Sequence, residues 1–130
     1  MKILQDIWIL DEGGIVIFHR EFDKAVSPQL FGAMMSALNY FAEQLAERGL
    51  SNFELQNTRF TIIKQSGLIF VANSSREITQ KKVNKELKKI SDKFFKLYSE
   101  ELKNFEGQID AFTGFIKEIE NALEEKPDNL

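Results

Sequence analysis

The sequence predicts an α/β protein of the α+β type: a five-stranded sheet with one helix on one face and two on the other, in the order ββαβββαα. Three observations lead to this fold class. Several short segments are apolar at every position, so the strands they form need cover on both faces. One amphipathic helical segment lies between the second and third predicted strands. Two more helical segments follow the fifth strand, and together the three helices would cover every apolar surface.

The first two strands are predicted at 7–10 and 15–18, joined by the tight turn Asp11-Glu12-Gly13-Gly14. Glycine suits such a turn because it reaches positive φ without a clash at Cβ. Successive strand side chains point to opposite faces, yet both strands are apolar on both faces. In the full order the first strand becomes central, beside the fifth, and the second becomes an edge. Since 15–18 is too apolar for a free edge, we expect a helix end or a partner to cover it.

The first helix is predicted to begin at Pro28, with Ser27 as its N-cap, and to end near Arg48, before Gly49. Apolar residues recur within it every three to four positions, as on one face of an amphipathic helix. We expect this face to cover the sheet; it comprises Leu30, Phe31, Met34, Ala37, Leu38, Phe41, Ala42 and Leu45.

Three further strands are predicted at 53–56, 60–64 and 68–72, with turns at 57–58 and 65–67. The segment Phe53-Glu54-Leu55-Gln56 alternates apolar with polar residues, which predicts a half-exposed strand at an edge. The fifth strand, 68–72, is apolar on both faces and is therefore expected in the interior. Residues 73–76 are polar and are expected to form a loop.

Two helices complete the predicted domain. The longer spans about 79–104, and its apolar stripe is Val83, Leu87, Ile90, Phe94, Leu97, Tyr98, Leu102 and Phe105. Glu106-Gly107 breaks it, and a last helix follows at about 108–124, with Ile109, Phe112, Phe115, Ile116, Ile119 and Leu123 as its apolar positions. We expect one domain at 1–125 and a frayed tail at 126–130.

Composition excludes several kinds of chemistry. The chain has 130 residues, no cysteine, a single histidine and a net charge of −3. Disulfides and thiolate chemistry are therefore impossible, and a dedicated nucleic-acid binder is disfavoured. No segment approaches the roughly 18 apolar residues that a membrane-spanning helix needs, and the first residues lack the pattern of a signal peptide. We expect a cytoplasmic protein.

Candidate catalytic residues are weak. His19 has Glu21 and Asp23 nearby but no nucleophile motif, so a surface histidine is the favoured interpretation. The carboxylates Asp11, Glu12 and Asp23 match no metal-loop spacing and are better explained as turn residues. The Gly13-Gly14 pair lacks the following Lys-Ser/Thr of a phosphate-binding loop. We therefore expect no enzyme activity, no metal and no cofactor.

The order of elements resembles the longin-like (SNARE-like) fold, and the roadblock proteins are close structural relatives of that fold. Local patterns carry the resemblance at 7–17, 31–38 and 67–72, and again at Phe94, Tyr98, Leu102, Phe105 and Gly107. It covers nearly the whole chain, from about Ile3 to Leu123. The resemblance implies an antiparallel sheet and a stand-alone domain, since no SNARE heptads follow. The lysine- and isoleucine-rich composition suits an archaeal or deep-branching eukaryotic-like version.

Such domains resemble one another in using edge strands and the first helix for dimer or partner contacts. We therefore select Met35 and Tyr40, which fall off the apolar stripe of the first helix, and Phe53 and Leu55 on the edge strand as a candidate partner interface. A wide buried face that covers Met35 and Tyr40 is the alternative. A homodimer or heterodimer through this edge is expected.

Lysines are concentrated in the longer C-terminal helix. The candidate contacts to an anionic surface are Lys81, Lys82, Lys85, Lys88 and Lys89. They could attract the protein to the periphery of an anionic membrane or to an acidic partner. The alternative is a solvated face that keeps the protein soluble.

Two functions from different classes remain. The first is a non-catalytic protein-interaction module that binds a longin- or roadblock-like subunit or a small GTPase, in membrane-traffic-like complexes or GTPase regulation; this is what the resemblance implies. The second is a small-ligand sensor of the PAS or profilin-like type, which would need an internal pocket.

Overall fold

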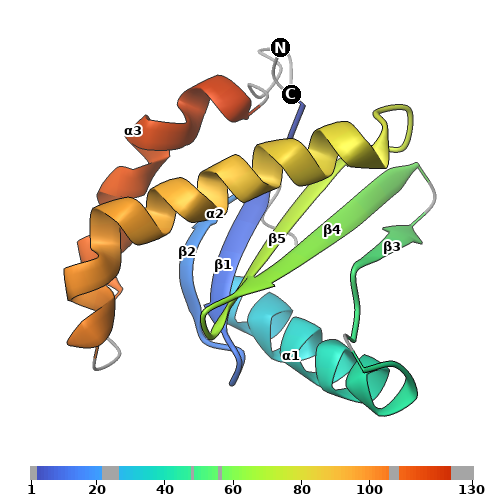
Figure 1. Cartoon of the computed structure of the whole chain (residues 1–130), viewed down its shortest axis with the longest axis horizontal. Coiled ribbons are helices and arrows are strands. Elements are labelled where there is room, and N and C mark those ends of the chain that lie inside the picture. Colours follow the sequence, from blue (N-terminus) through green and yellow to red (C-terminus); the bar gives the residue numbers. More distant parts are fainter. Residues whose placement is uncertain (1–2, 22–26, 48, 56, 106–108, 124–130) are drawn as a thin grey trace.

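The computed structural model describes residues 3–21, 27–47, 49–55, 57–105 and 109–123 (Figure 1). The elements follow the predicted order of five strands and three helical segments. The strands are β1 (Ile7–Asp11), β2 (Val16–Arg20), β3 (Asn52–Leu55), β4 (Thr58–Gln65) and β5 (Leu68–Ser75). The helices are α1 (Pro28–Leu45), α2 (Gln80–Lys103) and α3 (Ile116–Ile119), and α3 is flanked by the 3₁₀ segments η1 (Asp110–Phe115) and η2 (Glu120–Ala122).

The strands form one antiparallel sheet in the order β2-β1-β5-β4-β3. The prediction that the first strand is central, beside the fifth, is confirmed, and so are the two expected edges. β5 continues beyond its expected end, so the polar loop predicted at 73–76 is wrong for Asn73, Ser74 and Ser75. Asn73 stays in the sheet because its side-chain amide donates to Asp6 Oδ2 (3.0 Å), while its Oδ1 accepts from the Asp6 backbone N–H (2.7 Å).

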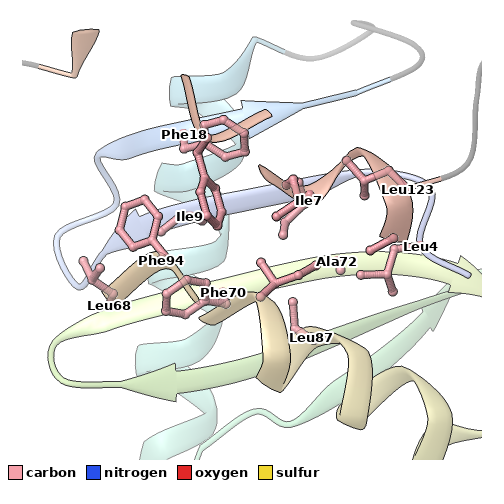
Figure 2. Packing of buried hydrophobic residues seen from close by; sticks show 14 of the residues in the cluster. Leu4, Ile7, Ile9, Phe18, Leu68, Phe70, Ala72, Leu87, Phe94 and Leu123 are labelled. Atoms are coloured by element: carbon pink, nitrogen blue, oxygen red, sulfur yellow. The ribbon is translucent and has the colours of Figure 1, made fainter. Parts of the chain in front are cut away.

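Both faces of the central strands are covered, as the two-faced apolar pattern of β1 predicted. On one face Ile7 and Ile9 pack with Phe70 of β5 and Phe94 of α2 (Figure 2). On the other, Trp8 and a smaller group that includes Met35 of α1 form a second cluster. Figure 1 shows α2 and α3 on one face of the sheet and α1 on the other. The surface of α1 and the surface of α2 and α3 therefore lie on opposite sides of the sheet.

The C-terminal segment is less regular than the helix predicted at about 108–124. It consists of two 3₁₀ segments around a single turn of α-helix. In a 3₁₀ turn, residues three apart lie on the same side. This geometry lets Phe112 and Phe115 both point into the core, where each is fully buried.

The apolar edge strand β2 is covered by helices of the same chain. The side-chain amide of Gln29, in the first turn of α1, accepts from the Val16 backbone N–H (2.9 Å) and donates to the Val16 carbonyl oxygen (3.0 Å). On the opposite face, the ring of Phe18 packs edge-on against Phe115, with 5.3 Å between centroids. Helix ends thus help to bury Val16 and Phe18, whereas Ile15, just before the strand, is 46% exposed.

Substitution of Gln29 tests whether its contacts with Val16 stabilise the edge of the sheet. Replacing Gln29 with alanine leaves the backbone N–H and the carbonyl oxygen of Val16 without their side-chain partner. We therefore expect the free energy of unfolding to fall by about 1–2 kcal/mol. The measurement is urea unfolding followed by the fluorescence of the single tryptophan, Trp8. Gln44→Ala, at an exposed position of the same helix, is the matched control. Equal effects of the two substitutions would contradict the role given to Gln29.

Candidate interaction surface

Helix α1 carries a row of exposed apolar side chains. We call it the α1 stripe, and it comprises Leu30, Met34, Leu38, Phe41 and Leu45. Their exposed fractions range from 41% for Leu38 to 76% for Leu45. The prediction that these residues cover the sheet is wrong. The helix is amphipathic as expected, but its main apolar face is exposed and lies beside the side that packs on the sheet.

Helix α1 packs on the sheet through a narrower face that contains Gly32, Met35 and Asn39. Gly32 lies so close to the hairpin that a Cβ there would overlap the carbonyl oxygen of Gly14 and lie 2.6 Å from Val16 Cγ2. Beside it, the Ser36 hydroxyl donates to the Glu12 carbonyl oxygen (2.7 Å). These contacts, with those of Gln29, fix the rotation of α1 and leave the stripe outside.

The two residues selected on α1 differ in accessibility. Met35 was selected as an interface candidate with burial as the alternative, and it is buried: only 4% of it is accessible, and it packs with Trp8 and Leu10. Tyr40 is 68% exposed and lines an open groove of about 680 Å³, together with Glu12, Ser36 and Glu43. Tyr40 is thus available to a partner, whereas Met35 contributes to the core.

The edge strand β3 is short and open on its outer side. Phe53 is half-buried and stacks on Phe60 of β4, with 4.8 Å between ring centroids and nearly parallel planes. Leu55 is exposed. Glu54 is held by Arg59 and Arg76, with N–O separations of 3.5 and 3.0 Å. Phe53 therefore supports the edge, and Leu55 is the apolar side chain that β3 offers to a partner.

Sequence reasoning missed the exposed α1 stripe. One signal for it was present, because α1 has apolar or small residues on a second side: Phe31, Gly32, Met35 and Ala42. A glycine in the middle of a helix lowers its stability unless a close approach requires it. Gly32 therefore marked the side of the helix that docks.

The five candidate lysines of α2 all lie on its solvent-exposed side. Lys88 donates to Asp92 Oδ1 and to Gln65 Oε1, both at 2.9 Å. The hydrogen bond from Lys88 lowers the pKa of the Asp92 carboxyl group. Among the described residues, the other four lysines have no carboxylate within ion-pair distance.

The weak catalytic candidates have structural roles in the described part of the chain. His19 Nδ1 lies 2.7 Å from Glu21 Oε2, and the Asp11 side chain accepts from the Ile15 backbone N–H (3.0 Å) in the hairpin turn. Asp23 lies outside the described residues. Within the described ranges, no group of three potential metal ligands was found, and none of the helices combines the length and hydropathy needed to span a bilayer.

The ligand-sensor alternative requires an enclosed pocket. Two hollows lined by described residues are open to the surface: the groove beside Tyr40, and an apolar groove of about 320 Å³ next to Phe95, Leu102 and Phe105. Between the sheet and α2, the space is filled by aromatic rings around Phe94. These features give the sensor interpretation no specific support.

Solved structures share this fold. The chain resembles the Roadblock/LC7 domain from Streptomyces avermitilis (TM-score 0.62, 16% identity, 75% of this chain and 87% of that chain). It also resembles Myxococcus xanthus MglB (TM-score 0.60, 16% identity, 75% and 85%) and the gliding protein MglB from Thermus thermophilus (0.53, 12%, 62% and 67%). At these identities the likeness establishes the fold.

Comparison of the sequence with family models identifies the family. No curated protein matches the chain. The model of the first longin domain of FUZ, MON1 and HPS1 matches residues 5–112, which is most of the domain. It includes all five strands, α1 and α2, and therefore both the α1 stripe and the β3 edge. The chain thus belongs to the family of the first longin domain of FUZ, MON1 and HPS1.

Proposed function

We propose that this longin domain is a non-catalytic interaction module, an adaptor in membrane-traffic-like complexes or small-GTPase regulation, and that it works by pairing with a second domain of its own fold. The observation that carries the proposal is the α1 stripe. Large contiguous apolar surfaces on soluble domains mark interaction sites. An 18-residue helix is about 27 Å long, so the stripe is long enough to form the centre of a standard interface.

The simplest occupant is a second copy of this chain. Two copies of an open edge strand can pair antiparallel and continue the sheet, and this arrangement is self-complementary. The two-fold axis that relates such strands is perpendicular to the sheet. It would place the second α1 on the same face as the first, where the two stripes can cover each other. Leu55 and Tyr40 would then lie at or near the interface.

The α1 stripe supplies the test of pairing. We expect the wild-type chain to be dimeric in analytical ultracentrifugation. For the double variant Leu38→Gln/Phe41→Gln we expect the dimer dissociation constant to rise at least roughly a hundredfold, because four apolar side chains per dimer lose their buried contacts. Glutamine keeps the helix propensity and the net charge. The folded state of the variant is verified by circular dichroism.

Leu97→Gln is the control for this experiment, because Leu97 is an exposed apolar residue on α2, on the opposite face of the sheet. We expect it to leave the dimer intact. A wild-type chain that stays monomeric at high concentration would rule out self-pairing, and so would a double variant that dimerises as tightly as the wild type.

A further inference from the structure

The first ten residues of α2 concentrate positive charge. Residues 80–89 contain five lysines and one acidic residue, Glu86, which gives this segment a net charge of +4. The whole chain carries −3, so the rest of it carries −7. We call the five exposed side chains the lysine face: Lys81, Lys82, Lys85, Lys88 and Lys89.

Two of these lysines, Lys81 and Lys82, lie in the first turn of α2, which is the unfavourable end of the helix for a cation. The N-terminus of a helix carries partial positive charge, so acidic residues stabilise it and lysines do not. The first turn of α2 contains no acidic residue, and its capping group is the neutral Thr79, whose hydroxyl accepts from the Lys82 backbone N–H (3.3 Å). The arrangement lowers the stability of the isolated helix, and local choices that oppose the fold are typical of functional sites.

The molecule compensates little of this charge itself. Lys88 is paired with Asp92, whereas Lys81, Lys82, Lys85 and Lys89 make no ion pair with a described residue. An external anion would thus meet four uncompensated ammonium groups along about two turns of one helix.

The lysine face and the α1 stripe lie on opposite faces of the sheet, since α2 and α1 cover opposite faces (Figure 1). Both surfaces can therefore be occupied at once. In the dimer proposed above, the two-fold axis is perpendicular to the sheet, so both α2 helices would lie on the same outer face. Pairing would then present two lysine faces side by side, and this doubling rests on the proposed dimer.

We propose that the lysine face docks the domain on an anionic phospholipid surface, with the interaction surface of α1 turned away from the lipid. Four to eight basic residues on one helix are typical of contacts to anionic lipid headgroups. A nucleic acid is the less suitable occupant, because residues 80–89 contain no arginine and no aromatic side chain to stack on bases. The contact is electrostatic and peripheral.

Vesicle co-sedimentation tests the proposal. The full chain is expected to bind vesicles of equal parts phosphatidylserine and phosphatidylcholine, and not vesicles of phosphatidylcholine alone. Lys85→Gln/Lys89→Gln is expected to weaken binding roughly thirtyfold, since each lysine near a charged surface contributes about a fivefold factor. The double variant should unfold at about the same temperature as the wild type, because both lysine side chains are exposed and lie beyond the first turn and the cap of α2.

The control is Lys103→Gln/Lys117→Gln, which changes the charge equally but outside the lysine face, and should alter binding less than about threefold. Absence of wild-type binding, equal losses in both variants, or tighter binding to DNA than to the anionic vesicles would each overturn the proposal. The monomeric variant Leu38→Gln/Phe41→Gln should still bind these vesicles, though more weakly, through its single lysine face. The experiments can therefore contradict the lipid-binding proposal without contradicting the proposed dimer, and the reverse.

Discussion

Replacing Phe94 with alanine is expected to lower the free energy of unfolding by about 3–5 kcal/mol, a large part of the stability of a domain this size. Phe94 is fully buried on α2, and its ring lies 5.0 Å from that of Phe115, 5.4 Å from Phe112 and 5.9 Å from Phe70 between centroids. It therefore joins α2, the C-terminal segment and β5 in one cluster (Figure 2). Truncation leaves a cavity that three separate elements would have to fill.

Denaturant unfolding measures this loss, and two further variants make the result specific. Phe94→Leu should cost clearly less, because most of the volume is kept. Leu97→Ala, one turn further along the same helix but exposed, should change stability by less than about 1 kcal/mol. If Phe94→Ala were no more destabilising than Leu97→Ala, the C-terminal segment would not be held by this cluster.

Replacing Gly32 with alanine is expected to destabilise the domain by about 2–3 kcal/mol, opposite in sign to the usual effect of this substitution inside a helix. Alanine normally stabilises a helix relative to glycine by about 1 kcal/mol. Here the new methyl group would overlap the Gly14 carbonyl oxygen and the Val16 side chain. Both belong to the β1–β2 hairpin, so α1 must move away from it.

Trp8 reports directly on this movement, because it stacks on Phe31 of α1 with 4.1 Å between ring centroids. We expect its emission to shift to longer wavelength in the native state of Gly32→Ala as α1 moves away. Gly114→Ala is the matched control: the nearest atom to its new Cβ would be the Tyr98 hydroxyl oxygen, at 3.8 Å. A stabilised Gly32→Ala variant would show that the hairpin yields easily and does not set the position of α1.

Much of the fold could be predicted because its signals are local. The apolar pattern of β1 on both faces required cover on both sides, and the structure provides two clusters there. Ser27-Pro28 predicted the start of α1, and the Ser27 hydroxyl indeed accepts from the Leu30 backbone N–H (3.2 Å). Strand β5 was predicted too short because polar residues suggested a loop. The partner that retains Asn73 in the sheet, Asp6, is 67 residues away in the chain.

The candidate site was predicted in part. Tyr40, Leu55 and the lysine face are exposed, whereas Met35 is buried and the α1 stripe was assigned to the interior. Helical periodicity identifies an apolar face but carries no information about the surface that covers it. Burial within one chain and burial between two chains require the same side chains at the same spacing.

The sequence by itself determined the order of elements, the central position of β1 and β5, the two edges of the sheet and the charge of α2, because periodicity, turn residues and composition express these directly. Only the tertiary structure decided which way α1 faces. That choice depends on the fit of Gly32 against Gly14 and on hydrogen bonds from Gln29 and Ser36 to the hairpin. These contacts are specific to a pair of surfaces, and they turn the apolar stripe of α1 outward.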